Sequence, residues 1–161
     1  MILELYKKHS NIIHQAIQRG NVNKQESILQ FKKYIVEHAV ISKTNDHVSI
    51  NTVECRKIFN SLAILSCNEF ININNESATY VFDFCNSTFK AKNNDYGNSF
   101  LDFGTIGIII RINDKLNRIE SLMNTKEHKG MVSNESILDN YLDLLNYSII
   151  GLICLDMDSI L

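Results

Sequence analysis

The chain contains no proline and only six glycines among its 161 residues. Proline blocks the propagation of a helix, and a glycine inside a helix costs about 1 kcal/mol relative to alanine. A sequence that nearly lacks both can build long, uninterrupted helices. A chain of this length can also bury a sizeable core in one unit, so we expect residues 1–161 to form a single all-α domain.

Apolar residues recur at helical spacing in six segments, and polar stretches separate these segments. The first two segments are expected to pair as a helical hairpin. Residues 70–82 alternate enough to allow either a short strand or an irregular loop, and the sequence leaves this open. The predicted helices span residues 2–18, 23–42, 50–66, 80–92, 104–123 and 135–155.

Charge and composition exclude several classes of function. The formal net charge is -2 and no basic run is present, so a polymeric nucleic-acid partner is not favoured. No run of about 18 apolar residues predicts a membrane span, and no signal peptide is visible at the N-terminus, so we expect a cytoplasmic protein. The cysteines lack the paired spacing of a zinc site and predict buried free thiols; they are Cys55, Cys67, Cys85 and Cys154.

The predicted helix 104–123 is apolar on most sides but carries one charged stripe. Arg111, Asp114 and Arg118 follow i, i+3, i+7 spacing, and Lys115 lies alongside. The simplest interpretation is a solvated outer face with ion pairs such as Arg111 to Asp114, each worth a few tenths of a kcal/mol. The alternative is a binding site for an anion.

The last predicted helix carries an acidic stripe. Glu135, Asp139 and Asp143 recur at i, i+4, i+8, with Asn146 and Tyr147 one turn further on the same side. Stacked carboxylates repel each other by roughly 0.2–0.5 kcal/mol per pair, whereas a cluster of oxygens suits Mg²⁺. The alternative is a solvated acidic face on which Glu135 favours the helix N-terminus.

Three motifs occur in order along the C-terminal half: K-N-x-D-Y-G, R-x-x-D-K-x-x-R and E-S-I-x-D-x-x-x-D-L-x-N-Y. In these motifs the chain resembles the nucleotide-modification-associated domain of the first type, a family common in bacteriophages and prophages. The resemblance covers residues 81–155. It leaves residues 1–80 as an N-terminal helical extension, which we expect either to enlarge the site or to form the interface of a homo-oligomer.

This family is distantly similar to the all-α nucleoside triphosphate pyrophosphatases of the MazG and helical dUTPase group. In that group, carboxylates from two helices hold Mg²⁺ against the phosphates of a nucleotide. The relatives have an E-x-x-E pair where this chain has Arg111 and Asp114, which favours phosphate binding over metal-dependent hydrolysis. The resemblance implies the metal ligands Asp114, Glu135, Asp139 and Asp143, of which Asp114 and Asp139 would be catalytic.

The resemblance also implies a set of substrate-binding residues, beginning in the stretch KNNDYGNSFLDFG at residues 92–104. Gly97 allows a tight turn there, in which Lys92 would meet phosphate, Asp95 would bind a sugar or base, and Tyr96 would stack on a base or pack in the core. The remaining implied contacts come from the two charged helices: Arg111, Lys115, Arg118, Asn146 and Tyr147.

The first functional hypothesis is a nucleotide-binding protein of a bacterial host cell, in which Mg²⁺ assists the attack of water on a (deoxy)nucleoside triphosphate. The alternative is a protein without catalysis that sequesters a nucleotide-derived immune signal, cyclic or of the ADP-ribose type, and so counters anti-phage defence. A structural assembly protein is the third possibility, and it would leave the acidic stripe unexplained.

Overall fold

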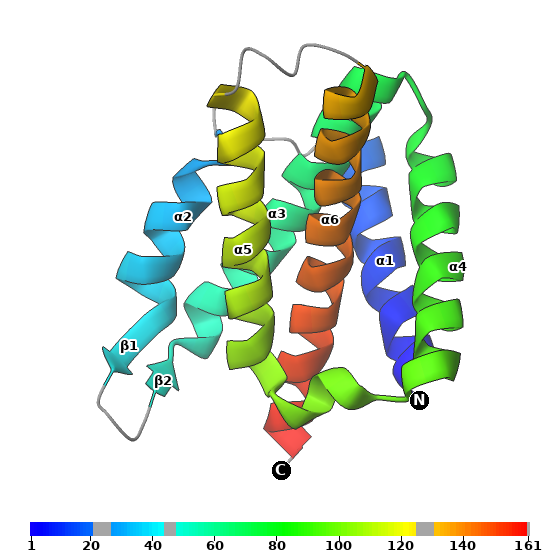
Figure 1. The fold of residues 1–161 in the computed structure, drawn as a ribbon. Coiled ribbons are helices and arrows are strands. Elements are labelled where there is room, and N and C mark those ends of the chain that lie inside the picture. The colour runs from blue at the N-terminus through cyan, green and yellow to red at the C-terminus, as the bar shows by residue number, and fades with distance from the viewer. Residues whose placement is uncertain (21–26, 44–47, 125–130, 161) are drawn as a thin grey trace.

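The computed structural model describes residues 1–20, 27–43, 48–124 and 131–160, and it confirms the all-α architecture. Two short strands, β1 (Val40–Lys43) and β2 (Val48–Ile50), form an antiparallel hairpin beside the helices (Figure 1). The helices are α1 (Ile2–Gln18), α2 (Gln30–Tyr34), α3 (Thr52–Asn74), α4 (Ala78–Tyr96), α5 (Gly104–Asn124) and α6 (Met131–Ile160).

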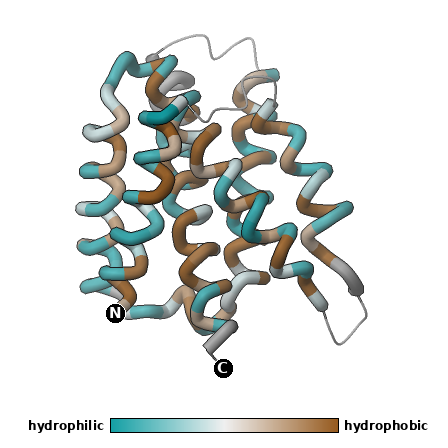
Figure 2. The backbone as a smooth tube through the Cα atoms, turned by 180° about the vertical axis from the view of Figure 1, so that it is seen from behind, coloured by the Kyte–Doolittle hydropathy of each residue, from teal (hydrophilic) through white to brown (hydrophobic). Residues whose placement is uncertain are grey.

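Helix α6 is the centre of the bundle. It packs most extensively against α3 and α5, and it also contacts α1 and α4 (Figure 1). The buried cluster runs from Ile2 in α1 to Leu155 in α6, so the N-terminal helices share one core with the C-terminal ones. Figure 2 shows hydrophobic and hydrophilic residues alternating along the helices, as expected when each helix buries one face.

The apolar character of α6 follows from its central position. Residues 137–158 are long and apolar enough to cross a membrane by length and composition, and no other helix in the described part of the chain passes this test. However, 61% of the 18-residue stretch that meets this test is buried inside the protein. The core helix of a globular bundle has this composition, because most of its surface is covered by the neighbouring helices.

The predicted helix 23–42 is wrong in both extent and partner. Its first residues lie outside the described part of the chain, and α2 ends at Tyr34, followed by a π-helical turn (η1, Ile35–Ala39) and then β1. The β-branched Val40 pairs with Ile50 of β2, and this ladder competes successfully with the helix. Helix α2 packs mainly on α3 and α5, whereas the prediction paired it mainly with α1.

The open segment 70–82 contains no strand and is helical except at residues 75–77, which connect two helices. Helix α3 continues through it to Asn74 and ends at Asn75, which adopts a left-handed conformation with φ of 53°. Helix α4 then begins after Ser77, whose Oγ accepts a hydrogen bond from the Tyr80 N–H at 3.1 Å.

The stretch 92–104 is helical in its first five residues, so the predicted turn is limited to Gly97 and Asn98. Its polar residues are tolerated there because the last turn of α4 is mostly exposed to water. Gly97 ends the helix with φ of 63°, a value that favours glycine. A short 3₁₀ turn (η2, Ser99–Asp102) then leads to α5, which begins at Gly104 as expected.

An ionic junction at the C-terminal end of α6 joins three helices. His9 Nε2 of α1 lies 2.6 Å from Asp156 Oδ2, and Arg56 Nη2 of α3 lies 3.0 Å from Asp156 Oδ1. Partial burial alone would raise the pKa of Asp156, but the hydrogen bonds from His9 and Arg56 outweigh it and lower that pKa below its usual 3.8. The carboxylate therefore stays charged and ties α1 and α3 to α6.

The four cysteines are buried and free, as predicted. Burial raises the pKa of Cys55 to about 11 and those of Cys67, Cys85 and Cys154 to about 12. Because the thiolate is the reactive form, we expect a thiol reagent at pH 8 to modify none of them in the native protein and all four after denaturation. A thiol that reacts rapidly without denaturant would contradict this burial.

Candidate functional site

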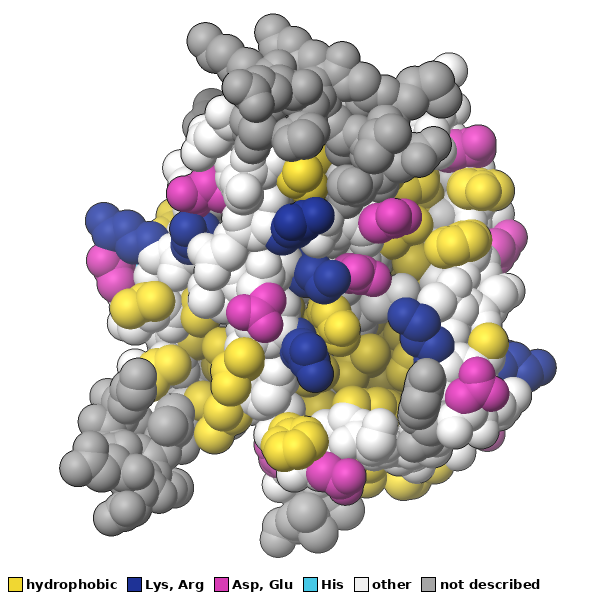
Figure 3. Space-filling view, in the orientation of Figure 1, with side chains coloured by type: hydrophobic (Ala, Val, Ile, Leu, Met, Phe, Trp, Pro, Cys, Tyr) yellow, Lys and Arg dark blue, Asp and Glu magenta, His cyan; other side chains and the backbone are white. Residues whose placement is uncertain are grey.

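The charged stripes of α5 and α6 face each other across one cavity of about 430 Å³, which we call the charged cavity. Figure 3 shows the Lys, Arg, Asp and Glu side chains that gather over these two helices. The family resemblance implied this convergence, except for Asn140. The cavity is lined by Arg111, Asp114, Lys115, Arg118, Asp139, Asn140, Asp143 and Tyr147.

Within this cavity only one ion pair forms among the described residues. Lys115 Nζ lies 2.9 Å from Asp143 Oδ2, and the two side chains are 31% and 35% exposed. The expected pair between Arg111 and Asp114 is absent, and in the described part of the chain neither Arg111 nor Arg118 has a carboxylate partner. Two exposed guanidinium groups therefore remain available to an external anion.

A second cavity of about 210 Å³ adjoins the first, and we call it the aromatic cavity. It lies between the end of α4, the η2 turn and α6, and it shares Asp143 and Tyr147 with the charged cavity. Figure 3 shows hydrophobic side chains at the floor of a hollow beside the charged groups. The lining comprises Thr88, Phe89, Lys92, Asn93, Gly97, Ser99, Phe100, Asp143, Asn146, Tyr147 and Ile150.

The wall of the aromatic cavity is supported from behind by α1. The ring of Tyr6 stacks on Phe89 at a centroid distance of 4.1 Å, and Phe89 lies 6.0 Å from Phe100. The hydroxyl of Tyr6 donates a hydrogen bond to Oδ1 of Asn146. Burial, together with the neighbouring Cys85, raises the pKa of Tyr6 well above its usual value, so its hydroxyl remains protonated.

The structure unites most of the predicted site residues but not all of them. Lys92 and Asn146 line the aromatic cavity, whereas Asp95 is exposed and lines neither cavity. The side chains of Tyr96 and Glu135 lie outside the described part of the structure. Sequence reasoning missed Tyr6, which supports one wall from behind. It also missed several lining residues, namely Thr88, Phe89, Asn93, Ser99, Phe100, Asn140 and Ile150.

The described carboxylates do not fit a Mg²⁺ site by themselves. Asp114, Asp139 and Asp143 line the charged cavity, but no three His, Cys, Asp or Glu side chains among the described residues gather closely enough to hold a metal ion. Asp143 is already paired with Lys115, and Arg111 and Arg118 line the same cavity. These cations would oppose a further positive charge.

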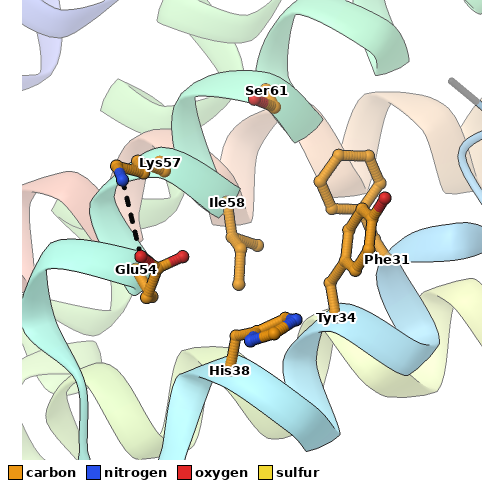
Figure 4. A pocket seen from close by; sticks show the side chains of 7 residues that line it. All are labelled: Phe31, Tyr34, His38, Glu54, Lys57, Ile58 and Ser61. Carbon is orange, nitrogen blue, oxygen red and sulfur yellow. Dashed lines mark hydrogen bonds and ion pairs between the residues drawn. The ribbon is translucent and has the colours of Figure 1, made fainter. Parts of the chain in front are cut away.

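A third cavity, of about 230 Å³, lies between α2 and α3 (Figure 4). Its one lysine, Lys57, lies 3.5 Å from Glu54 and is already paired, so this cavity is less suited to an anion. We call it the α2–α3 cavity. Phe31, Tyr34, His38, Glu54, Lys57, Ile58 and Ser61 line it.

Comparison with known proteins singles out the segment that carries the two adjoining cavities. Residues 92–155 match the family model described as nucleotide modification associated domain 1, which confirms the resemblance over a shorter range than predicted. This segment includes every residue of the charged cavity and all but Thr88 and Phe89 of the aromatic cavity. No curated protein and no solved structure matches the chain, so the similarity to the MazG group stays a prediction.

Proposed function

We propose that this protein binds a nucleotide, with the phosphates in the charged cavity and the ring in the aromatic cavity. The observation that carries the proposal is a pair of guanidinium groups, Arg111 and Arg118, that have no carboxylate partner among the described residues and line a cavity that continues into an aromatic one. The match of residues 92–155 to a nucleotide-modification-associated family supports the same ligand class.

The chemistry of each cavity suits one part of a nucleotide. Guanidinium groups donate two parallel hydrogen bonds to phosphate oxygens, and one helical stripe presents Arg111, Lys115 and Arg118 together. The ring requires an apolar surface with a few polar groups, which Phe100, Ile150 and the neighbouring amides provide. Tyr147 borders both cavities, where the ring and the phosphates of one ligand would join.

Between the two functional hypotheses, the cation-rich lining favours binding without turnover. Metal-dependent hydrolysis of a triphosphate requires several carboxylates that are free to hold the ion, whereas Lys115 occupies Asp143 here. We therefore favour a protein that holds its nucleotide intact, as the sequestration of an immune signal requires.

A ligand panel tests the proposal. The protein is heated with ribo- and deoxyribonucleoside triphosphates, cyclic nucleotides and ADP-ribose derivatives, each with and without Mg²⁺. A ligand at about 100 times its Kd stabilises the native state by about 2.7 kcal/mol, which raises Tm by roughly 5–10 °C. Chromatography of the released ligand then separates the outcomes: intact nucleotide supports binding, pyrophosphate from repeated turnovers establishes hydrolysis, and no stabilisation by any ligand overturns the proposal.

Replacing Asp143 distinguishes direct phosphate contacts from a metal site. Asp143→Asn removes one negative charge and releases Lys115, so we expect about 3–10-fold tighter nucleotide binding by calorimetry in the presence of a chelator. Asp139→Asn removes a charge without releasing a cation, and its gain should be smaller. Glu54→Gln neutralises a carboxylate of the α2–α3 cavity and serves as the matched control. Weaker binding in both aspartate variants, seen only with Mg²⁺, would favour a metal site instead.

A further inference from the structure

The aromatic cavity has a polar side that the N-terminal part of the chain holds in place. Tyr6 of α1 is 1% exposed, stacks on Phe89 and donates its hydroxyl hydrogen to Asn146 Oδ1. Phe89 and Asn146 both line the cavity, although they belong to α4 and α6. One buried side chain outside the matched segment 92–155 therefore supports two walls of the cavity.

The hydrogen bond from Tyr6 decides which group Asn146 offers to a ligand. A side-chain amide has one acceptor oxygen and two N–H donors, and it can bind in either of two flipped orientations. Because Tyr6 occupies the oxygen, the amide nitrogen Nδ2 is the group left for the cavity. With the Tyr6 hydroxyl removed, nothing in this contact would prevent the amide from turning.

Asn93 supplies the opposite chemistry on the same cavity. Its Oδ1 is buried and has no hydrogen-bond partner among the residues that the structure describes. A buried acceptor without a partner is unfavourable, and a small rotation of the amide into the cavity would let a donor on a ligand satisfy it. Asn146 and Asn93 thus offer one donor and one acceptor beside the rings of Phe89 and Phe100.

We propose that the aromatic cavity recognises the edge of a nucleobase that carries an acceptor beside a donor, and that Tyr6 is the positioning residue that fixes Asn146 for this recognition. The inference rests on the proposed function and adds to it recognition of the base edge. Every common nucleobase carries an acceptor beside a donor, so the relative position of the two amides would set which base is preferred. Affinity for the phosphates would depend on α5, and discrimination among bases would depend on α1.

The test compares base discrimination with phosphate affinity. Calorimetry measures the Kd values of ATP, GTP, CTP and UTP, with inorganic triphosphate as the probe without a base. Tyr6→Phe keeps the stacked ring and removes the hydroxyl, so we expect the preference for the best base to fall about 5–10-fold while the Kd of inorganic triphosphate stays unchanged. Tyr141→Phe, a buried tyrosine of α6 that lines neither adjoining cavity, is the matched control.

A second variant keeps the test decisive if Tyr6→Phe folds poorly. Asn146→Asp retains an acceptor for Tyr6 and removes the donor from the cavity, so it should lose the same preference. If the wild-type protein discriminates among bases and both variants keep the same ratio of Kd values, the role of Tyr6 and Asn146 is wrong, and the rest of the proposal is unaffected. Wild-type binding without any preference would overturn the base recognition and leave the proposed function intact. A wild-type protein that binds no nucleotide would overturn both.

Discussion

Nucleotide affinity is expected to fall by at least about 100-fold when Arg111 and Arg118 are both replaced with alanine. Each guanidinium donates charge-assisted hydrogen bonds worth roughly 1.5–3 kcal/mol, and no cation in the described part of the charged cavity except Lys115 could compensate. Because both side chains are exposed, the lower end of this range applies to each. Two such losses amount to about 3 kcal/mol, or slightly more than a 100-fold change in Kd.

This double substitution leaves the core untouched, so the Tm of the free protein should stay within about 2 °C of the wild-type value. Lys57→Ala removes the lysine of the α2–α3 cavity and controls for the general loss of positive charge. Calorimetry with the nucleotide that gives the largest thermal shift provides the measurement. Equal affinities in the wild type and the double variant would place the phosphates outside the charged cavity.

The charged cavity could be predicted from the sequence because helical periodicity alone determines which side chains share a face. Arg111 and Arg118 lie two turns apart on α5, and Asp139 and Asp143 lie one turn apart on α6. Once each segment is helical, these groups form stripes. That the two stripes face each other followed only from the family resemblance, since helical periodicity does not determine how two helices pack against each other.

The aromatic cavity could not be predicted in the same way. Tyr6 and Asn146 are 140 residues apart, and nothing in the local sequence of α1 distinguishes Tyr6 from an ordinary core residue. Phe89 likewise has the spacing of a buried helix position. Such contacts are set by the packing of α1, α4 and α6 around one core, which no local pattern encodes.

The errors in secondary structure have a common physical origin. Val40 lies in a run with helical spacing, yet it is β-branched and pairs with Ile50, and the sequence between their strands is polar, which is also the signature of a hairpin. Asn93 and Lys92 looked too polar for a helix, yet the last turn of α4 is mostly exposed and tolerates them. At Val40 strand propensity and pairing outweighed the helical spacing of the run, and at Lys92 and Asn93 exposure to water made polar residues compatible with a helix.

The close contact between α3 and α6 predicts a second large effect. An added Cβ at Gly151 would lie 2.6 Å from Phe59 Cε2 and 2.8 Å from both Cδ2 and Cζ, shorter than any normal contact. Phe59 is 1% exposed and has no room to move away. We therefore expect Gly151→Val to lower the free energy of unfolding by about 3 kcal/mol and Tm by roughly 6–12 °C.

Ser148→Ala is the matched control in the same helix, since Ser148 is fully buried and its Oγ has no hydrogen-bond partner among the described residues. Removing that hydroxyl should leave Tm unchanged or slightly higher. Denaturation in urea measures the free energy of unfolding for each variant, and an unchanged value for Gly151→Val would mean that the two helices do not approach this closely.

A double-substitution cycle identifies the contact itself. Phe59→Ala alone leaves a cavity and should cost about 3–5 kcal/mol, but the same cavity would accept the valine side chain at position 151. The combined variant should then lose less stability than the sum of the two single losses, by roughly 1–3 kcal/mol.

The candidate site should respond to the same substitutions, because Asn146 and Tyr147 precede Gly151 by about one turn of α6 and line the aromatic cavity. If Gly151→Val displaces this helix, nucleotide affinity should fall even at temperatures where the variant is folded, and Phe59→Ala should restore part of it.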